Sequence, residues 1–180
     1  YEPAALGELL AQLAQASTRS ALHVFPGRSA AALQAAFLSR NEAQPAWNLR
    51  KMLSIHEQSY LPQAGYDAFL GECDLNFVRG EDSLVRALLA GRAFVWQIYP
   101  QSDGAHAAKL EAFLQWLDAP EDWRQFHRVW NGLSTAALPP LALARWSECV
   151  QAARARLLAQ TDLVTQLLDF VEEKAALQTS

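Results

Sequence analysis

The stretch CDLNFVRGEDSLVRA, residues 73–87, contains the transition that decides the fold. Residues 75–78 form a short apolar run that predicts a buried strand, and residues 82–89 predict a helix. Arg79 and Gly80 form a tight polar turn between the two. A strand that passes through glycine into a helix leaves free backbone N–H groups at the carboxyl edge of a sheet. Such a helix start suits an anion, usually a phosphate.

Four side chains around this turn have the chemistry of a binding site. Arg79 offers a bidentate cation and Ser83 offers a hydroxyl donor, while Glu81 and Asp82 add two carboxylates in the first helical turn. Acidic residues at this position also complement the helix dipole and then need no function, so that interpretation stays open here. Because like charges repel, two acids suit a phosphate site only if one of them faces a sugar hydroxyl or an attacking nucleophile.

Strand and helix patterns alternate through the first part of the chain. This alternation predicts parallel strands with helices on both faces of the sheet, an α/β, Rossmann-like fold. Ser29 is predicted to cap the second helix. Helices are expected at residues 4–16, 30–40 and 66–71, and strands at residues 21–25, 51–55 and 94–98, in addition to those of the opening stretch.

Only helices are expected after Tyr99, at residues 105–117, 120–130, 141–160 and 163–176. We therefore divide the chain into an α/β domain, residues 1–117, and a helical extension, residues 118–180, that packs on it. The start of the chain leads straight into a helix, without the strand that such a fold places before it. From this we expect the chain to be a piece of a longer protein.

Composition excludes several classes of function. The chain has 180 residues, of which 51% are hydrophobic and 19% charged, which is typical of a globular domain. A net charge of −4 provides no basic stripe for a nucleic acid. Two cysteines make no disulfide framework, and no apolar run reaches membrane-spanning length, so a cytoplasmic location is expected. The four histidines lack metal-ligand spacing, and we expect no metal.

Three linked motifs between residues 73 and 113 carry a resemblance to a known family. They are RGEDS, then AG-x-x-FVW-x-IYPQ, then H-x-x-KLEAF, in that order, and the upstream YLPQ and the opening YEP also fit. On these residues the chain resembles the C-terminal half of EarP, the protein-arginine rhamnosyltransferase of bacterial elongation factor P. The resemblance covers residues 1–113. It implies the donor-binding half of a two-domain glycosyltransferase of the GT-B layout, whose C-terminal helices cross back onto the N-terminal half.

The resemblance also implies an activity. It is the transfer of L-rhamnose from dTDP-β-L-rhamnose to an arginine of elongation factor P, with inversion at the sugar carbon and with no cofactor beyond the donor substrate. In the family the general base is presumed to be an aspartate of the N-terminal domain, which this chain does not contain. We therefore expect the chain to bind the donor nucleotide without turnover on its own.

Ligands of open parallel sheets bind beyond the carboxyl ends of the strands. The segments expected to converge there are residues 1–2, 56–63, 79–83 and 99–104.

Three of the expected donor contacts concern the base and one end of the diphosphate. Tyr60 matches an aromatic that stacks on thymine, although the family more often has a residue of the Phe type there. Gln63 matches a residue near the nucleotide, and Tyr1 matches an aromatic at the diphosphate end. The alternative for the first two is structural, with Tyr60 covering a core and Gln63 lying beside a helix cap.

The remaining assignments fall on the turn itself. Glu81 matches a carboxylate that the family needs for activity, and Asp82 matches a residue that borders the donor, so both are predicted to be catalytic. Gln101 lies on a loop expected to face the same crevice. The predicted donor contacts of this group are Arg79, Gly80, Glu81, Asp82, Ser83 and Gln101.

Two other classes of function stay open at this point. A Rossmann half of an oxidoreductase is disfavoured because no G-x-G-x-x-G turn follows a strand. A non-catalytic nucleotide-binding or scaffold module remains possible, with residues 79–83 as an ordinary helix start.

Overall fold

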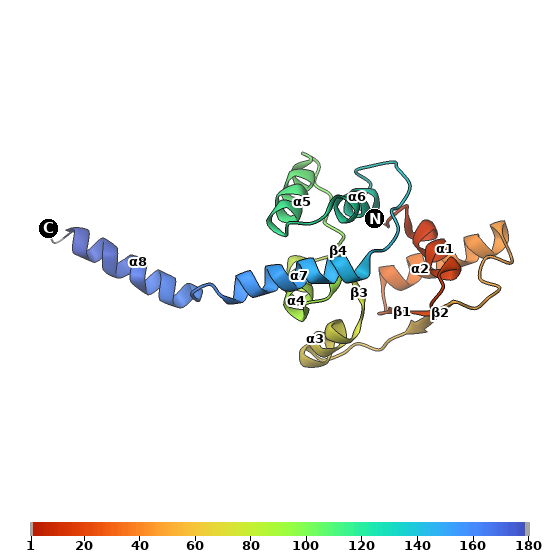
Figure 1. Ribbon diagram of the computed structural model, residues 1–180, viewed down its shortest axis with the longest axis horizontal. Coiled ribbons are helices and arrows are strands. Elements are labelled where there is room, and N and C mark those ends of the chain that lie inside the picture. Colours follow the sequence, from red (N-terminus) through yellow and green to blue (C-terminus); the bar gives the residue numbers. More distant parts are fainter. Residues whose placement is uncertain (1, 179–180) are drawn as a thin grey trace.

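The computed structural model describes residues 2–178, and in its first half strands alternate with helices (Figure 1). Four strands are present where four were predicted, and each is followed along the chain by a helix. The elements of this half are α1 (Leu6–Gln15), β1 (Ser20–Val24), α2 (Arg28–Ala43), β2 (Leu53–Glu57), α3 (Gln63–Glu72), β3 (Leu75–Val78), α4 (Glu81–Ala90) and β4 (Ala93–Trp96). The helices α5 (Ala105–Trp116), α6 (Glu121–Trp130), α7 (Leu143–Leu158) and α8 (Leu163–Gln178) follow.

The strands pair in parallel, which confirms the predicted fold class. β1 pairs with β2, beginning at Ser20 opposite Leu53, and β3 pairs with β4, beginning at Leu75 opposite Ala93. Among the described residues these are two separate two-stranded sheets. In the doubly wound order, the strand ahead of the first helix lies between two such pairs. The described residues contain no strand ahead of α1.

Several predicted bounds are wrong: α3 begins at Gln63, three residues earlier than expected, and α2 extends beyond its expected residues 30–40 at both ends. Two further differences have a clear physical cause. β2 begins at Leu53, two residues later than expected, because the chain first turns at Lys51, whose φ is +51°. Asn48 then fixes the strand start with bonds to both backbone groups of Leu53. Ser29 does not cap α2. The helix begins at Arg28, with Gly27 at the cap position and no side-chain cap, so Ser29 lies inside the first turn.

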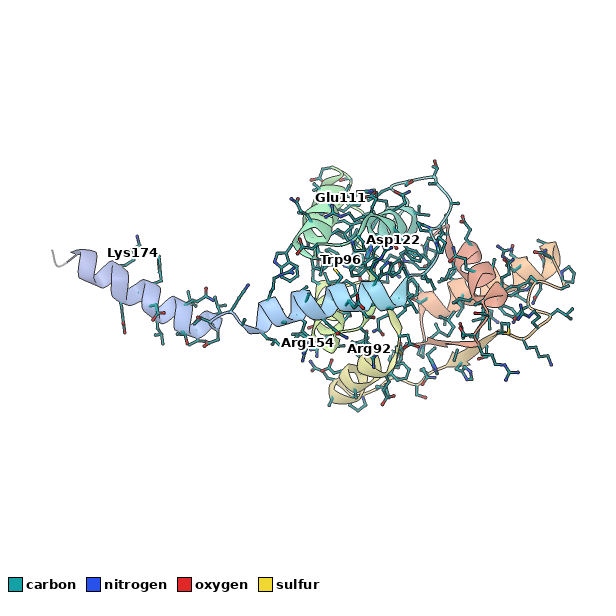
Figure 2. The ribbon with its side chains drawn as sticks, viewed as in Figure 1. Arg92, Trp96, Glu111, Asp122, Arg154 and Lys174 are labelled. Carbon is teal, nitrogen blue, oxygen red and sulfur yellow. The ribbon has the colours of Figure 1, made fainter. Side chains whose placement is uncertain are left out.

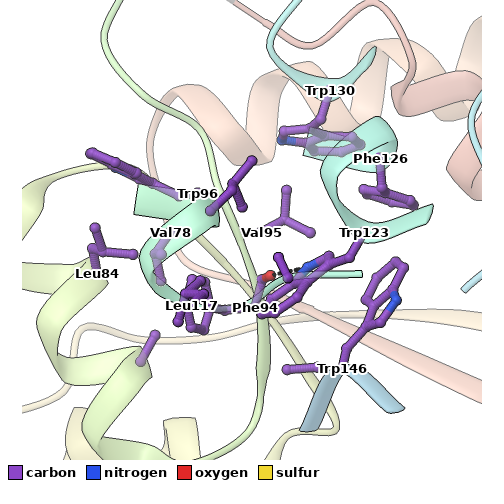
Figure 3. Close-up of a cluster of buried hydrophobic side chains, with 14 of the residues drawn as sticks. Val78, Leu84, Phe94, Val95, Trp96, Leu117, Trp123, Phe126, Trp130 and Trp146 are labelled. Atoms are coloured by element: carbon purple, nitrogen blue, oxygen red, sulfur yellow. Dashed lines mark hydrogen bonds between the residues drawn. The ribbon is translucent and has the colours of Figure 1, made fainter. Parts of the chain in front are cut away.

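The main core surrounds β4, all of whose side chains are buried (Figure 3). Phe94 meets Trp123 of α6 edge to face at 5.5 Å between ring centroids, and Trp123 stacks on Trp146 of α7 at 5.8 Å. Burial of large aromatic side chains stabilises a fold by about 2–3 kcal/mol each. Trp123 and Trp146 are therefore packing residues of this core. A second cluster lies between α1, α2 and the β1–β2 pair.

Side chains of α6 and its C-cap close the outer edge of β4. Three residues spaced four apart along one helix face satisfy backbone groups of the strand that point away from β3, so the sheet ends there without an open edge. The bonds are Trp123 Nε1–H to Phe94 O (3.0 Å, dashed in Figure 3), Trp96 N–H to His127 Nε2 (3.0 Å), Asn131 Nδ2–H to Trp96 O (2.9 Å) and Ile98 N–H to Asn131 Oδ1 (2.9 Å).

His127 performs this task as a neutral imidazole. It is completely buried, and burial lowers its pKa to about 4. With Nε2 accepting from Trp96 N–H, Nδ1 carries the proton and donates to Trp123 O at 3.0 Å. Protonation of Nε2 would abolish the bond to the strand.

The last helix stands apart from this body. α6 and α7 pack into the core, whereas α8 extends away from it and the side chains described on it, Lys174 among them, point into solvent (Figures 1 and 2). Within residues 2–178 no helix combines the length and apolar character needed to cross a membrane. Among the side chains of α8 that the structure describes, the exposed large apolar ones are Leu163, Val164, Leu167, Leu168, Phe170 and Val171.

Candidate functional site

The start of α4 presents backbone N–H groups, as the opening stretch predicted. Gly80 is the residue before the helix and makes no side-chain cap. The first helical bond runs from Leu84 N–H to Gly80 O at 3.0 Å. The amides of Glu81, Asp82 and Ser83 therefore precede the first bonded turn and have no helical acceptor. This geometry suits an anion at the carboxyl edge of β3 and β4.

Arg79 connects the ends of these two strands. Its carbonyl accepts a hydrogen bond of 2.8 Å from Trp96 Nε1, at the end of β4. Its guanidinium carbon lies 5.8 Å from the centroid of the Tyr99 ring. Arg79 is half-buried. Arg79 is thus tied to the end of β4 just before α4 begins, and its contact with a phosphate stays a prediction.

Glu81 forms an ion pair with Lys109 of α5. Lys109 Nζ lies 2.8 Å from Glu81 Oε1 and 5.6 Å from the centroid of the Trp96 ring. The hydrogen bond from Lys109 lowers the pKa of Glu81, and both side chains are more than half exposed, at 53% for Lys109 and 63% for Glu81. Glu81 is therefore ionised and can change partner at little cost.

Asp82 faces a different neighbour. Arg86, one helical turn later, bonds Asp82 Oδ2 at 2.7 Å and also pairs with Asp67 of α3 at 2.9 Å. Gln63, the first residue of α3, has its amide oxygen against the same guanidinium. The structure thus brings the predicted residues Gln63 and Asp82 together through Arg86. This arrangement ties the start of α3 to the start of α4.

Ser83 is also engaged with α3. Its hydroxyl bonds Tyr66, whose pKa is raised by burial. Ser83 therefore already has a partner on α3, although its backbone N–H stays at the start of α4.

The other predicted residues are not joined to this group by a described contact. Tyr60 lies on the loop before α3 with 78% of its surface exposed, so its ring is available for stacking. Gln101 is exposed and donates its N–H to His106 Nδ1, near the start of α5, at 3.1 Å. Tyr1 lies outside the described residues.

Sequence reasoning missed Arg86 and Trp96. The spacing of Asp82 and Arg86, four residues apart, is a pattern that favours an ion pair on a helix, so Arg86 was open to detection. Trp96 was placed in a strand and in the core, but nothing local indicates that its indole reaches Arg79, 17 residues earlier in the chain.

Two hollows of the surface lie away from the start of α4. One of them, about 230 Å³, is lined mainly by α2 and by the ends of β1 and β2, including Leu33, Phe37 and Ile55. It is open and largely apolar and has no cation for a phosphate. Within residues 2–178, no group of three or more histidines, cysteines or acids is arranged to hold a metal ion.

Comparison with known proteins identifies similar sequences and similar solved structures. The family described as Elongation-Factor P (EF-P) rhamnosyltransferase EarP matches residues 1–172. A protein-arginine rhamnosyltransferase of Pseudomonas aeruginosa is 40% identical over 73% of this chain and 36% of its own length. The enzyme of the same name from Pseudomonas putida is 36% identical over 94% of this chain and 48% of its own length.

A solved structure that concerns EarP-mediated arginine glycosylation of translation elongation factor EF-P is similar over 96% of this chain and 58% of its own, with a TM-score of 0.71 and 28% identity. The chain spans about a third to a half of the length of the curated relatives it matches.

Proposed function

The chain belongs to the EarP family of EF-P rhamnosyltransferases, and from this premise we propose that it forms the half of such an enzyme that binds dTDP-β-L-rhamnose. The observation that carries the proposal is the start of α4 with two cationic residues near it. Arg79 comes just before Gly80 and the helix, Lys109 pairs with Glu81, the first residue of α4, and the first backbone N–H groups of the helix have no helical acceptor. A diphosphate is the anion whose size and charge match two cations and a helix start.

The proposed reaction joins rhamnose to an arginine of EF-P. The bond from the sugar carbon to the diphosphate oxygen breaks, a bond from that carbon to a guanidinium nitrogen forms on the opposite face, and the configuration inverts. The nitrogen loses a proton to a base, which the resemblance places in the N-terminal domain of longer relatives. This chain stabilises the leaving dTDP through Arg79 and the amides of α4. Because EF-P is a translation factor, the reaction takes place in the cytoplasm.

The two predicted catalytic acids receive different roles. Glu81 is exposed, and its ion pair with Lys109 lies at the surface, so the carboxylate is available to orient the sugar or the acceptor guanidinium. Asp82 is held by Arg86 and faces α3. We assign Asp82 to the support of the site and Glu81 to the contact with the reacting groups.

Tyr60 and Gln63 complete the donor site at the base end. The exposed Tyr60 ring supplies a stacking face, and Gln63, two residues after Leu61, supplies an amide at the start of α3. Gln101 and Tyr1 are further donor contacts in this proposal. Neither a metal ion nor a cofactor is assigned a part in it.

Calorimetric titration of the chain with dTDP tests the proposal, with UDP and NAD as competitors for specificity. Tyr60→Ala and Arg79→Ala are expected to weaken dTDP binding. Arg92→Ala is the matched control, because Arg92 lies at the opposite end of β4, where it bonds Gly71 O. Each variant is first shown to be folded by circular dichroism.

Saturable dTDP binding that Tyr60→Ala and Arg79→Ala weaken, and Arg92→Ala does not, supports the proposal. If the folded chain binds no dTDP, the same titration is repeated on a full-length family member carrying the matching substitutions. Unchanged dTDP binding by those full-length variants would overturn the assignment of these residues.

A further inference from the structure

Trp96 is a buried core residue whose backbone and indole are both hydrogen-bonded. It is the last residue of β4 and only 2% exposed. Its backbone N–H and C=O are both bonded to the α6 side, through His127 and Asn131. The position of its Cα is thus fixed from outside the sheet. The side chain that leaves this fixed point crosses to the other strand of the pair, where it reaches the site.

The indole of Trp96 contacts the backbone of Arg79 and the ammonium group of Lys109, the two cationic residues of the proposed donor site. Nε1 donates to Arg79 O at 2.8 Å, and the ring centroid lies 5.6 Å from Lys109 Nζ. Phe113 of α5 packs edge-on against the ring at 5.4 Å and limits its rotation. One rigid group therefore connects the turn after β3 with the ion pair of α5.

The bond to Arg79 acts on the peptide that begins the helix. Arg79 O belongs to the peptide unit that also contains Gly80 N–H, and Gly80 is the residue before α4. Because a peptide unit is planar, a bond that fixes its oxygen also fixes the direction of its N–H. Glycine at this place has no side chain to hold the turn, so the indole supplies the constraint.

We propose that Trp96 is a positioning residue of the donor site, because its indole holds the Arg79–Gly80 peptide and supports Lys109, and thereby sets where a diphosphate binds. This inference rests on the proposed function of the site. Trp96 does not touch the donor in this proposal. It acts through Arg79, Gly80 and Lys109.

Trp96→Phe tests the inference, because it keeps an aromatic core and removes the N–H donor. Trp123→Phe is a matched control. Trp123 is also buried, and its indole N–H also donates to a backbone carbonyl, that of Phe94 in β4, at 3.0 Å. Phe94 lies toward the end of β4 that is opposite Trp96. Both variants are expected to lose stability. Only Trp96→Phe is expected to weaken dTDP binding. The dissociation constant should rise by about fivefold to tenfold, which is the effect of losing one hydrogen bond.

A second readout needs no ligand. Amide hydrogen exchange at Leu84 and Gln97 reports the turn, because Leu84 N–H bonds Gly80 O and Gln97 N–H bonds Val78 O. Trp96→Phe is expected to speed exchange at these two amides beyond the global change, and Trp123→Phe is not. If Trp96→Phe does not fold, replacement of the Trp96 indole by benzothiophene keeps the fused ring and removes only the N–H.

The outcomes separate the two proposals. If the unaltered chain binds dTDP, and Trp96→Phe and Trp123→Phe bind it equally well, the positioning role is overturned and the proposed function stands. Exchange at Leu84 and Gln97 that is unchanged after loss of the indole N–H also overturns the positioning role. If exchange is locally faster but neither this chain nor a full-length relative binds dTDP, the proposed function fails instead.

Discussion

The ion pair of Glu81 and Lys109 allows the electrostatics of the site to be measured through one quantity, the pKa of Glu81. The hydrogen bond from Lys109 is the largest cause of the lowered Glu81 pKa. Lys109→Met is therefore expected to raise the Glu81 pKa toward the ordinary value of a glutamate, which an NMR titration of the Glu81 side-chain carboxyl measures. Because both partners are exposed, the thermal unfolding temperature should change little.

Lys174→Met is the control for this residue-scale prediction, since Lys174 lies on α8, far from the site (Figure 2). It should leave the Glu81 pKa where it is. A Glu81 pKa that stays low in Lys109→Met would show that the backbone amides at the start of α4 hold the carboxylate without help.

The residues of the site illustrate what a sequence can reveal at this scale. The positions of Arg79, Glu81 and Ser83 could be predicted because all three lie in or next to the turn between β3 and α4. The turn fixes where each residue lies relative to the start of the helix. The partners of Asp82 and Ser83 could not be predicted, because Asp67 and Tyr66 belong to α3 and approach only when α3 and α4 pack together.

Among the elements, α6 determines how the sheet ends. His127 must be neutral to accept from Trp96 N–H, and its pKa in the folded chain is about 4, against an ordinary value of 6.5. Between those two pH values the unfolded chain binds a proton that the folded chain does not. The free energy of unfolding is therefore expected to fall as the pH is lowered from about 6.5 toward about 4, by up to about 1.4 kcal/mol per pH unit.

Urea unfolding at several pH values between 7.5 and 5 measures this dependence, before the carboxylates with lowered pKa values, Glu111 and Asp122, begin to titrate. His127→Gln keeps an acceptor and does not titrate, so it should flatten the curve. His106→Gln, which removes a half-buried histidine at the start of α5, should keep the dependence. A curve for His127→Gln as steep as that of the unaltered chain would contradict the assignment.

The prediction of the elements succeeded where local patterns are strong. β3 has the bounds that the apolar run predicts, and α4 extends the predicted helix by one residue at each end. β2 was misplaced because a turn at Lys51 and two bonds from Asn48, rather than hydrophobicity, decide where it starts. The hydrogen bonds between α6 and β4 join residues about 30 positions apart, such as Trp123 and Phe94. No short sequence motif predicts bonds over this separation.

At the scale of the whole molecule, the parallel pairing and the family followed from the sequence, while the two separate pairs of strands did not. α1 links them, since its Leu9 belongs to the cluster around β4 and its neighbour Leu10 to the cluster beside β1. The relatives are two to three times as long as the part that this chain matches. The donor half therefore acts, in the proposed function, together with segments that this chain does not include.

The apolar surface of α8 leads to the last prediction. Its exposed apolar residues include Leu163 at 70%, Leu167 at 54% and Val171 at 61%, spaced along one side of a helix that leaves the body (Figure 1). An exposed apolar surface of this kind favours association in water. We propose that in longer family members it packs against the remainder of the protein, and that in this chain alone it causes self-association.

A chain that ends at Gln160 is therefore expected to sediment as a monomer at concentrations where the 180-residue chain associates. It should keep the same thermal unfolding temperature and the same dTDP affinity, because the core around β4 contains no residue of α8. Leu167→Lys combined with Val171→Lys is the matched variant, since it keeps the helix and removes its apolar side. If the shorter chain unfolds more than about 5 °C earlier, a loss of roughly 1 kcal/mol or more for a domain of this size, then α8 packs on the body in solution and its apolar side is not free for a partner.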